Sequence, residues 1–431
     1  MDWEAPRIEP SKFHILRKPL FSKNFLLILI LGLLTAIGPL SIDMYLPAFP
    51  DIARNLHTTI AEVTLSLSSF FIGISFGQLI YGPLMERFGR KRPLYGGLLL
   101  YLLASSGCAL AGSIHHLIFF RLLQALGGSV GLVAARAIVR DLFEVRENAR
   151  IFSLLMLVVA ISPIIAPTAG GYITTFITWR FIFVVLIAIN LLIMAGIYFL
   201  LPETKKPDPE FSLKFQAIFK NFGGIFKHPQ FYTYALTGAI AYAGLYAYVS
   251  GSPYVFMEIF RVNERQYGWI FAFIAMGIIG SSQVNNYFLR KYSSEQIIRF
   301  ACFSQSVIGG CLLLLTLFGW SELFSTTLLI FLFLCCQGFI FPNASALSLA
   351  PFGHVAGNAS ALMGAIQMSI GAGASALVSL FQNTTPVPMT TIMACCALTA
   401  FGVFHFGGKI ISDHAGKNLV REEEVEMIST L

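Results

Sequence analysis

The sequence has few charged residues. Asp, Glu, Lys and Arg make up 12% of its 431 residues, about half the share in an ordinary soluble protein. Apolar residues make up 56%, and the mean hydropathy is +0.73. A soluble chain with 40 Phe and so few charges would lack the polar surface that keeps a protein dissolved. The composition therefore excludes a disordered chain and a soluble domain, and it predicts a protein that crosses a membrane several times.

Cysteine is also scarce and uninformative. All seven cysteines lie within apolar runs, where a thiol packs as a small hydrophobic group. The neighbours Cys335 and Cys336 point to different faces of a helix and lack the spacing of metal ligands, as do Cys395 and Cys396. The sequence has no basic recognition module, phosphate-binding loop or facing pair of catalytic side chains. It therefore argues against a metal site, a disulfide scaffold, a nucleic-acid partner and an enzyme.

Long apolar runs are abundant. Because each crossing takes roughly 20 mainly apolar residues, the runs predict an all-α membrane protein with twelve transmembrane helices. The first run is too long for the apolar part of a signal peptide and has no small-residue cleavage site. The predicted spans are 24–48, 62–84, 93–111, 117–139, 151–173, 180–201, 231–253, 267–288, 297–318, 323–349, 358–381 and 388–408.

The distribution of positive charge predicts the orientation. Of the 29 Lys and Arg residues, only Arg54, Arg180, Arg261 and Arg265 fall on one set of alternate segments between the spans. The other set includes both termini and carries nearly all the rest. Because short segments rich in Lys and Arg stay in the cytoplasm, both termini are expected there.

The longest segment between spans is basic and divides the chain in two. The predicted parts are an N-terminal tail over 1–23, a six-helix half over 24–201, a cytoplasmic linker over 202–230, a second six-helix half over 231–408, and a C-terminal tail over 409–431. Two parallel-repeat halves are typical of transporters that bind substrate between the halves near the middle of the membrane.

One carboxylate lies within an apolar span. Of the 22 Asp and Glu residues, all but Asp43 fall in loops, in tails or at span edges. A charge in the hydrocarbon costs about 3 kcal/mol or more, so an ionisable group there is a functional candidate. A buried carboxyl can exchange a proton near neutral pH. We predict that Asp43 carries the proton if transport is proton-coupled. The alternative is that it caps a helix break before Pro47.

Arg121 is the expected cationic partner of Asp43. At about 1.5 Å per helical residue, the two groups reach a similar depth on antiparallel helices. Gln124 continues the Arg121 face of its helix. The alternative is that Arg121 extends to the outer interface. Arg136, nearer the cytoplasmic end, is either part of an inner gate or a membrane anchor.

Polar and aromatic side chains inside the spans are candidates for a substrate cavity, because sites for lipophilic ligands are mostly apolar with a few placed polar groups. For each of them, packing or hydrogen bonding between helices is the alternative. The candidates are Tyr45, Gln124, Tyr242, Tyr246, Gln337, Asn343 and Gln367.

A segment rich in glycine and arginine follows the second span; over 82–92 it reads GPLMERFGRKR. Its glycines permit a tight turn and a close backbone approach. Glu86 is suited to the N-terminus of a neighbouring helix, of which the eleventh span is the obvious one. The basic residues can pair with acids on adjacent loops. The segment is predicted to be a latch that stabilises one conformation, and the alternative is a positively charged loop without a gating role. The latch residues are Gly82, Glu86, Arg87, Gly89, Arg90 and Lys91.

This segment resembles the G-x-L-x-D-R-x-G-R-[KR] loop motif of the major facilitator superfamily, with Glu86 in place of the usual Asp. The stretch RLLQA over 121–125 resembles the R-x-x-Q-[GA] motif of the fourth helix. The stretch SPIIAPTAGG over 162–171 is similar to the antiporter motif of the fifth helix, which is typical of exporters rather than importers. Pro and Gly there shape a kinked, closely packed helix. The residues concerned are Pro163, Pro167, Gly170 and Gly171.

Three further segments narrow the resemblance. They read SIDMYLPAFP over 41–50, ARAIVRD over 135–141 and GNASALMGAIQ over 357–367. With the motifs above, they resemble the bicyclomycin-resistance and chloramphenicol-efflux (Bcr/CflA) subfamily of drug:proton antiporters. Membership implies that Asp43 couples protons to substrate with Arg121 as its charge partner.

The expected function is proton-coupled export of small lipophilic drugs or toxic compounds across a bacterial inner membrane by alternating access. The expected partners are a small-molecule substrate, protons and the lipid bilayer. The protein is expected to work as a monomer, driven by the proton gradient and without a cofactor. The main alternative is a dedicated exporter of one endogenous metabolite, such as a siderophore, with the same fold and coupling.

Overall fold

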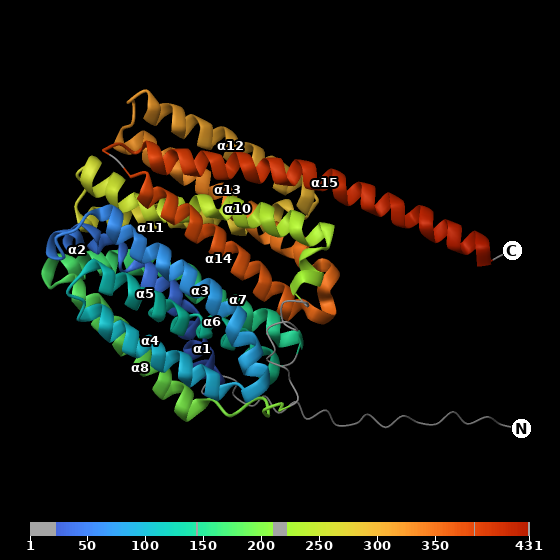
Figure 1. The fold of residues 1–431 in the computed structure, drawn as a ribbon, viewed down its shortest axis with the longest axis horizontal. Coiled ribbons are helices and arrows are strands. Elements are labelled where there is room, and N and C mark those ends of the chain that lie inside the picture. Colours follow the sequence, from blue (N-terminus) through green and yellow to red (C-terminus); the bar gives the residue numbers. More distant parts are fainter. Residues whose placement is uncertain (1–22, 144, 210–221, 383, 430–431) are drawn as a thin grey trace, which may run out of the picture.

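The structure is a computed structural model that describes residues 23–143, 145–209, 222–382 and 384–429. Every regular element in these ranges is a helix, and Figure 1 shows the long helices side by side in one elongated assembly. The all-helical fold class predicted from the sequence is therefore confirmed.

The helices form two groups. The N-terminal bundle contains α1 (Lys23–Asp43), η1 (Leu46–Ala48), α2 (Phe49–Asn55), α3 (Ile60–Phe88), α4 (Lys91–Ala109), α5 (Ile114–Gly128), α6 (Val130–Leu142), α7 (Val145–Phe176) and α8 (Trp179–Leu200). The C-terminal bundle contains α10 (Pro229–Pro253), η2 (Tyr254–Ile259), α11 (Glu264–Phe288), α12 (Ser294–Leu317), α13 (Leu323–Leu349), η3 (Ala350–Val355), α14 (Ala356–Leu380) and α15 (Val387–Ser429).

Side-chain caps fix several helix starts. The Thr59 side chain accepts a hydrogen bond from the backbone N–H of Glu62 at 3.2 Å, at the start of α3. Reciprocal capping boxes begin α11 at Asn263 and α12 at Ser293. These side chains satisfy backbone N–H groups that the first helical turn leaves without partners. The helix starts therefore follow from local sequence.

The first predicted span is shorter as a helix than the sequence indicated. It was expected over 24–48, but α1 ends at Asp43, and the chain continues through η1 and α2 to Asn55. Pro47 lies in η1, where its missing N–H and fixed φ do not support a continuous α-helix. Asp43 therefore lies at the end of a helix and not within one.

The fourth predicted span, expected over 117–139, consists of two helices. The α5 helix ends at Gly128 and α6 begins at Val130. Two consecutive glycines weaken a helix, and Gly127 lies so close to the backbone of α4 at Tyr101 that a Cβ would overlap it. The break therefore accompanies close contact between neighbouring helices.

Among the described residues, ten helical segments are long and apolar enough to cross a membrane. They include neither α4 nor α10, although both are helices where spans were expected over 93–111 and 231–253. The α10 helix is rich in Tyr, Ser, Thr and Gly, and most of its residues are buried. A helix enclosed by protein does not need an apolar surface.

The ends of the predicted parts are only partly visible. The predicted N-terminal tail (except Lys23) and residues 210–221 of the linker lie outside the described residues. The α15 helix continues past 408 to Ser429, although its apolar part ends at Ile411.

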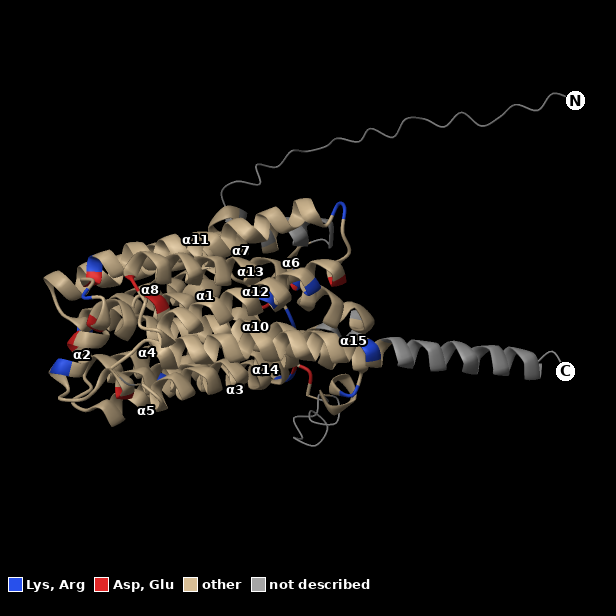
Figure 2. Cartoon of the chain, turned by 90° about the horizontal axis from the view of Figure 1, so that it is seen from above, with Lys and Arg blue, Asp and Glu red and all other residues tan. Residues whose placement is uncertain are grey.

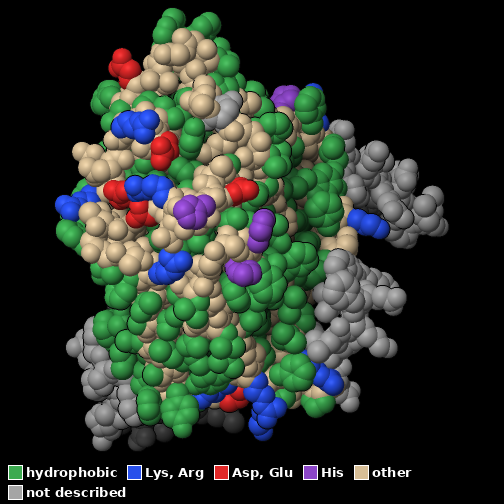
Figure 3. Space-filling view, turned by 60° about the vertical axis from the view of Figure 1, so that its left-hand side comes forward, with side chains coloured by type: hydrophobic (Ala, Val, Ile, Leu, Met, Phe, Trp, Pro, Cys, Tyr) green, Lys and Arg blue, Asp and Glu red, His purple; other side chains and the backbone are tan. Residues whose placement is uncertain are grey.

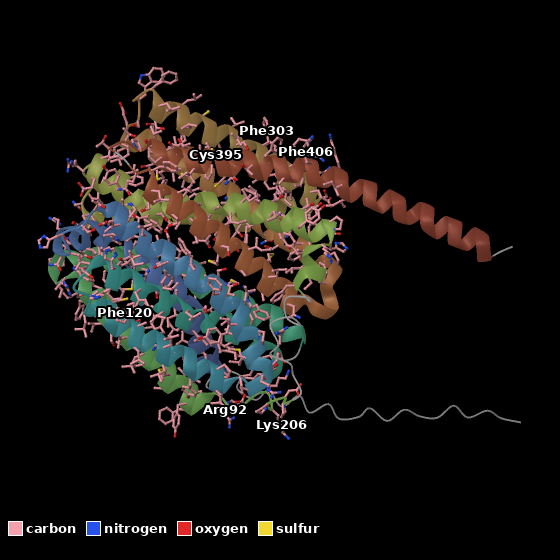
Figure 4. The ribbon with its side chains drawn as sticks, in the orientation of Figure 1. Arg92, Phe120, Lys206, Phe303, Cys395 and Phe406 are labelled. Carbon is pink, nitrogen blue, oxygen red and sulfur yellow. The ribbon has the colours of Figure 1, made fainter. Side chains whose placement is uncertain are left out.

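The exterior of the bundle is apolar, and its charges lie mainly at the two ends. Figure 2 shows Lys, Arg, Asp and Glu near both ends and few of them between. On the face in Figure 3, charged and His side chains gather at one end above hydrophobic flanks. Phe303 and Phe406 point outward from the C-terminal bundle in Figure 4 and are 54% and 66% exposed. Because a charged side chain is costly in hydrocarbon, a surface with so few charges between its two ends suits a lipid bilayer. The chain is therefore a multi-pass membrane protein.

Candidate functional site

The two bundles meet mainly through two helix pairs, α3 with α14 and α7 with α11. The α3–α14 contact is polar. The Oγ of Ser68 hydrogen-bonds the Oγ of Ser375 at 2.7 Å, and Ser250 Oγ donates to Ser375 Oγ at 2.7 Å. Ser75 Oγ hydrogen-bonds Ser369 Oγ at 2.8 Å. We call these five residues the serine seam. It joins the bundles by single, weak bonds.

Glycines bring α7 and α11 into close contact. Gly171 on α7 lies against the backbone carbonyl of Glu264, and Gly268 on α11 lies against the backbone at Pro167. Gly170 packs against the carbonyl of Met44, just after α1. A Cβ at any of these glycines would overlap backbone atoms. The antiporter motif thus supplies close helix packing, and α7 continues as one helix through Pro163 and Pro167.

Asp43 is buried at the end of α1, just before η1, which contacts α10 and α11 of the C-terminal bundle. Its side chain is 6% exposed and forms no hydrogen bond or ion pair with the described residues. The candidate proton carrier is therefore a buried carboxyl without a counter-charge among the described residues.

Arg121 is fully buried, which excludes the alternative that it extends to the outer interface. Its guanidinium carbon lies 4.1 Å from the ring centroid of Phe70 and 4.5 Å from that of Tyr45. Its Nη1 donates to Gln124 Oε1 at 2.7 Å, while Nε and Nη2 have no partner among the described residues. In this conformation, Arg121 and Asp43 do not form an ion pair. Aromatic rings hold the cation instead.

Two of the predicted cavity residues lie in an aromatic cluster between the bundles. The Tyr246 ring on α10 is 4.6 Å from that of Phe71 on α3, and 5.4 Å from that of Tyr242. Tyr242 in turn packs on Phe341 of α13 at 4.9 Å. Gln367 on α14 lines a small cavity beside Phe341. Its volume of about 10 Å³ is about that of one water probe, and all of its lining residues belong to α10, α13 and α14 of the C-terminal bundle. It is therefore too small for a drug-sized ligand.

The other four predicted cavity residues are hydrogen-bonded within one bundle. Such bonds between helices were the alternative considered for each side chain. Tyr45 and Gln124 are buried in the N-terminal bundle, and Gln337 and Asn343 in the C-terminal bundle. Their partners are Ser66 for Tyr45, Ser105 for Gln124, the Ala241 carbonyl for Gln337 and Asn285 for Asn343.

The latch residues form a charged network at one end of the N-terminal bundle. Arg90 is 4% exposed; its Nε donates to Asp141 at 2.8 Å and its Nη1 to Glu86 at 3.0 Å. Glu86 also pairs with Lys205. Burial lowers the pKa of Arg90, but the hydrogen bonds to Asp141 and Glu86 outweigh burial, and the pKa is raised overall. The network holds the guanidinium charged.

The chain after α8 completes this network. The Glu203 carboxylate accepts from the backbone N–H groups of Arg90 at 2.7 Å and Lys91 at 3.2 Å. Lys91 Nζ donates to the Leu201 carbonyl at 2.8 Å. Arg87 Nη1 donates to the Asp208 carbonyl at 3.5 Å. Figure 4 shows Arg92 and Lys206 at the same end of the molecule. The latch thus fastens the start of the linker to the N-terminal bundle.

The two latch glycines differ in their surroundings. Gly89 ends α3 with φ of +80°, and a Cβ there would lie 2.9 Å from the Lys205 carbonyl oxygen. Gly82 lies within α3, not in the loop, and has open space where a Cβ would project. The close approach expected at both glycines is therefore found at Gly89.

The observed partners of Glu86 also differ from the one that the sequence indicated. The sequence indicated the N-terminus of the eleventh span, which is α14, but Glu86 is bound to Arg90 and Lys205. Instead, Arg136 on α6 crosses to α14, where its Nη1 donates to Ser360 Oγ at 3.1 Å. Of its two alternatives, this contact favours the inner gate.

Sequence reasoning missed the five residues of the serine seam. Each looks like an ordinary apolar-span residue, and only the packing of helices distant in sequence brings them to the interface. Period-3.6 patterns carry little information where nearly every face of a helix is apolar.

Comparison with known proteins agrees with this architecture. Residues 31–376 match the family described as Major Facilitator Superfamily. The chain is 35% identical over 406 residues to the uncharacterized MFS-type transporter YdgK of Bacillus subtilis, covering 94% of this chain and 100% of that one. It is 32% identical over 294 residues to a bicyclomycin resistance protein homolog of Haemophilus influenzae, covering 68% and 74%.

Further matches concern a third relative and the fold. A chloramphenicol resistance protein of Pseudomonas aeruginosa is 30% identical over 288 residues, covering 67% of each chain. The solved structure of a D-xylose-proton symporter superposes with a TM-score of 0.68 at 14% identity, covering 89% of this chain and 97% of that one. The family match spans most of the helices described above, and the chain therefore belongs to the Major Facilitator Superfamily, whose members are transporters and not enzymes.

Proposed function

We propose that the protein exports small lipophilic drugs or toxic compounds across a bacterial inner membrane in exchange for protons. The names of two relatives refer to resistance to bicyclomycin and chloramphenicol. The motif over 162–171, which resembles that of exporters, supports the outward direction, and its Gly171 brings α7 into close contact with α11.

The observation that carries the proposal is the pair of buried ionisable groups without a counter-charge. Asp43 has no partner among the described residues, and Arg121 has no acid beside it. Uncompensated buried charges are expensive, so such groups are expected only where protonation or a change of partner is part of the function.

The proposed cycle uses two partners of Asp43. In one conformation the ionised Asp43 pairs with Arg121, whose Nε and Nη2 are free to accept it as a partner. A proton from outside neutralises Asp43 and releases this pair. The substrate then binds from the cytoplasm near Tyr242 and Tyr246, and the proton leaves inward. Alternating access follows from separation of the bundles at the serine seam on one side at a time.

The proposal includes the predicted topology. We propose twelve spans, with α4 and α10 as the two that hydropathy alone does not identify, and both termini in the cytoplasm. The six-helix halves over 24–201 and 231–408, joined by the linker over 202–230, alternate around the site. The protein works as a monomer within the bilayer, without a cofactor.

Everted membrane vesicles provide the test. The vesicles are energised to an acid interior, and a pH-sensitive dye reports proton efflux when a compound is added. The compounds are chloramphenicol, bicyclomycin, a sulfonamide, a lipophilic cation and a siderophore. We expect several unrelated compounds to trigger proton efflux in the wild type and none in Asp43→Asn.

The control is Asp51→Asn, which removes a partly exposed acid of α2 that pairs with Arg54. It should behave as the wild type. Efflux that persists in Asp43→Asn would remove Asp43 as the proton carrier. A response to the siderophore alone would indicate a dedicated metabolite exporter instead of a drug exporter.

A further inference from the structure

A cation of the C-terminal bundle reaches aromatic rings of the N-terminal bundle. The guanidinium carbon of Arg265, on α11, lies 4.5 Å from the ring centroid of Phe176 and 5.4 Å from that of Tyr172, both on α7. The two rings stack on each other, with centroids 6.2 Å apart and an interplanar angle of 14°. Arg265 forms no ion pair with the described residues. Its charge is therefore held by the opposite bundle.

Local structure places these three side chains together. Tyr172 and Phe176 are four residues apart and share one face of α7. The α11 helix begins at Glu264, so Arg265 stands in its first turn. The Glu264 carbonyl oxygen lies against Gly171, where a Cβ would be only 2.6 Å from it. Because glycine leaves this space open, the start of α11 comes close enough to α7 for the guanidinium to reach the rings.

The contact lies at the end of the molecule that carries α2. Ile177, directly after Phe176, lines a groove together with Asp51 and Arg54 of α2. The latch is at the opposite end. In the proposed topology, Arg265 therefore holds the two bundles together on the outer side.

The other arginines at this end have partners within their own bundle. They are Arg54, Arg180 and Arg261. The guanidinium carbon of Arg180, for example, lies 4.3 Å from the ring centroid of Trp179, its neighbour in α8. The rings under Arg265 are 42% exposed at Tyr172 and 68% exposed at Phe176. An aromatic pair so exposed does not fill a core, and its contact is with a cation that has to move when the bundles separate.

At the latch end, an arginine crosses in the opposite direction. Arg136, on α6 of the N-terminal bundle, donates to Ser360 on α14 at 3.1 Å. Arg265 crosses from the C-terminal bundle to α7. Each end of the molecule thus has an arginine that connects the bundles, and both connections are present in this conformation.

We propose that Arg265 is an outer clasp, whose guanidinium holds the outer ends of α7 and α11 together and leaves the rings of Tyr172 and Phe176 when the outer side opens. This inference rests on the proposed export and adds a gating residue to it. An exposed cation–π contact is weak, and its loss shifts a two-state population by about two- to fivefold. The clasp can therefore open and close in each cycle.

Distances between spin labels test the proposal without a substrate or a proton gradient. The full-length protein without native cysteines is labelled at Leu110→Cys, after α4, and at Trp320→Cys, between α12 and α13, where both positions are exposed. In lipid nanodiscs, Arg265→Gln should raise the population with the longer distance about two- to fivefold. Arg265→Lys should raise it less, because an ammonium keeps the charge without the planar stacking.

The matched control is Arg180→Gln, which removes a cation–π contact within the N-terminal bundle. It should leave the distances unchanged. Unchanged distances in Arg265→Gln would overturn the proposal, and so would an equal shift in Arg180→Gln.

A ring variant separates the cation–π contact from the loss of charge. Phe176→Leu should also raise the population with the longer distance. Adding it to Arg265→Gln should produce no further rise, because the contact is already lost. Fully additive shifts would overturn the assignment to these rings. If circular dichroism shows that Arg265→Gln does not fold, Phe176→Leu decides alone, and unchanged distances would overturn the clasp.

The outcome is independent of the export assay. Vesicles that show no proton efflux with any compound would refute the proposed function, whereas the label distances decide whether Arg265 holds the bundles together.

Discussion

At the scale of the single residue, Arg121 shows how this protein holds a cation inside a membrane bundle. The guanidinium lies between the rings of Phe70 and Tyr45 and donates to Gln124. Cation–π contacts contribute about 2 kcal/mol when desolvated, which offsets part of the penalty of burial. A planar guanidinium stacks on aromatic rings in a way that a lysine ammonium does not. The arginine is therefore expected to be required for more than its charge.

Gly89 gives a residue-scale prediction for the latch. Its φ of +80° and the nearby Lys205 carbonyl leave little room for a side chain. We expect Gly89→Ala to lower the unfolding free energy by about 1–3 kcal/mol, because residues other than glycine rarely adopt this backbone conformation, with φ of +80° and ψ of −178°. Gly89→Asp should be worse, because the Glu203 carboxylate lies 3.2 Å from the added Cβ. Thermal unfolding of the purified protein measures both changes.

Gly82→Ala is the matched control for the latch. Gly82 lies within α3 with open space around it. Because Ala is about 1 kcal/mol more favourable than Gly inside a helix, this change should be neutral or stabilising. If both alanine variants melt at the same temperature, the strain assigned to Gly89 is absent.

At the scale of the element, two helix pairs join the bundles in different ways. The α7–α11 pair is tight, because Gly171 and Gly268 let backbones touch. The α3–α14 pair is bonded through serine hydroxyls. Hydrogen bonds between membrane helices contribute only about 0.6 kcal/mol each on average. The serine seam is therefore the easier contact to break and re-form.

Ser375→Ala tests the seam. It removes the bond between Ser375 and Ser68 that joins the bundles, about 0.6 kcal/mol; the bond of Ser375 to Ser250 lies within the C-terminal bundle. We expect the population in which α3 and α14 lie apart to rise about threefold relative to the closed one. Distances between spin labels at Ile72 on α3 and Leu377 on α14 report the two populations.

Ser306→Ala provides the comparison, since Ser306 on α12 is buried and bonds only the Cys302 carbonyl of its own helix. It should leave the distances unchanged. Unchanged distances in Ser375→Ala as well would mean that the seam does not hold the bundles together.

At the scale of the whole molecule, the charges define two ends and an apolar girdle between them. Arg54 and Arg180 lie at the end that carries α2, and the latch network lies at the other. The latch end is held together by pairs such as Arg90–Asp141. An excess of basic residues marks the cytoplasmic side of a membrane protein, so the latch end is expected to face the cytoplasm.

Cysteine labelling tests this orientation. In a variant without native cysteines, Gly112→Cys lies in the exposed loop between α4 and α5, and Lys206→Cys lies in the exposed start of the linker. A membrane-impermeant thiol reagent applied to intact cells should label Gly112→Cys fully. It should label Lys206→Cys only after the cells are permeabilised. Labelling of Lys206→Cys in intact cells would reverse the topology.

The sequence was most informative where a property is local. Apolar runs predicted the helices, and caps such as Thr59 and Asn263 fixed where some of them begin. The prediction from the sequence was wrong where an apolar run continues past the end of a helix. Asp43 was expected within a span, but it ends α1. Pro47 was visible in the sequence, and the structure places it in η1, which contacts α10 and α11.

By itself, the sequence determined that this is an all-helical membrane protein, and its motifs placed Asp43, Arg121 and the latch among the residues to examine. These conclusions follow from composition and short-range spacing, which the chain carries without folding. Only the tertiary structure decided which groups are partners. Glu86 meets Lys205 instead of α14, Arg121 meets aromatic rings instead of an acid, and Asp43 is buried without an ion-pair partner among the described residues. Partners come from helices distant in sequence, and in spans that are apolar on every face no pattern records which face meets which helix.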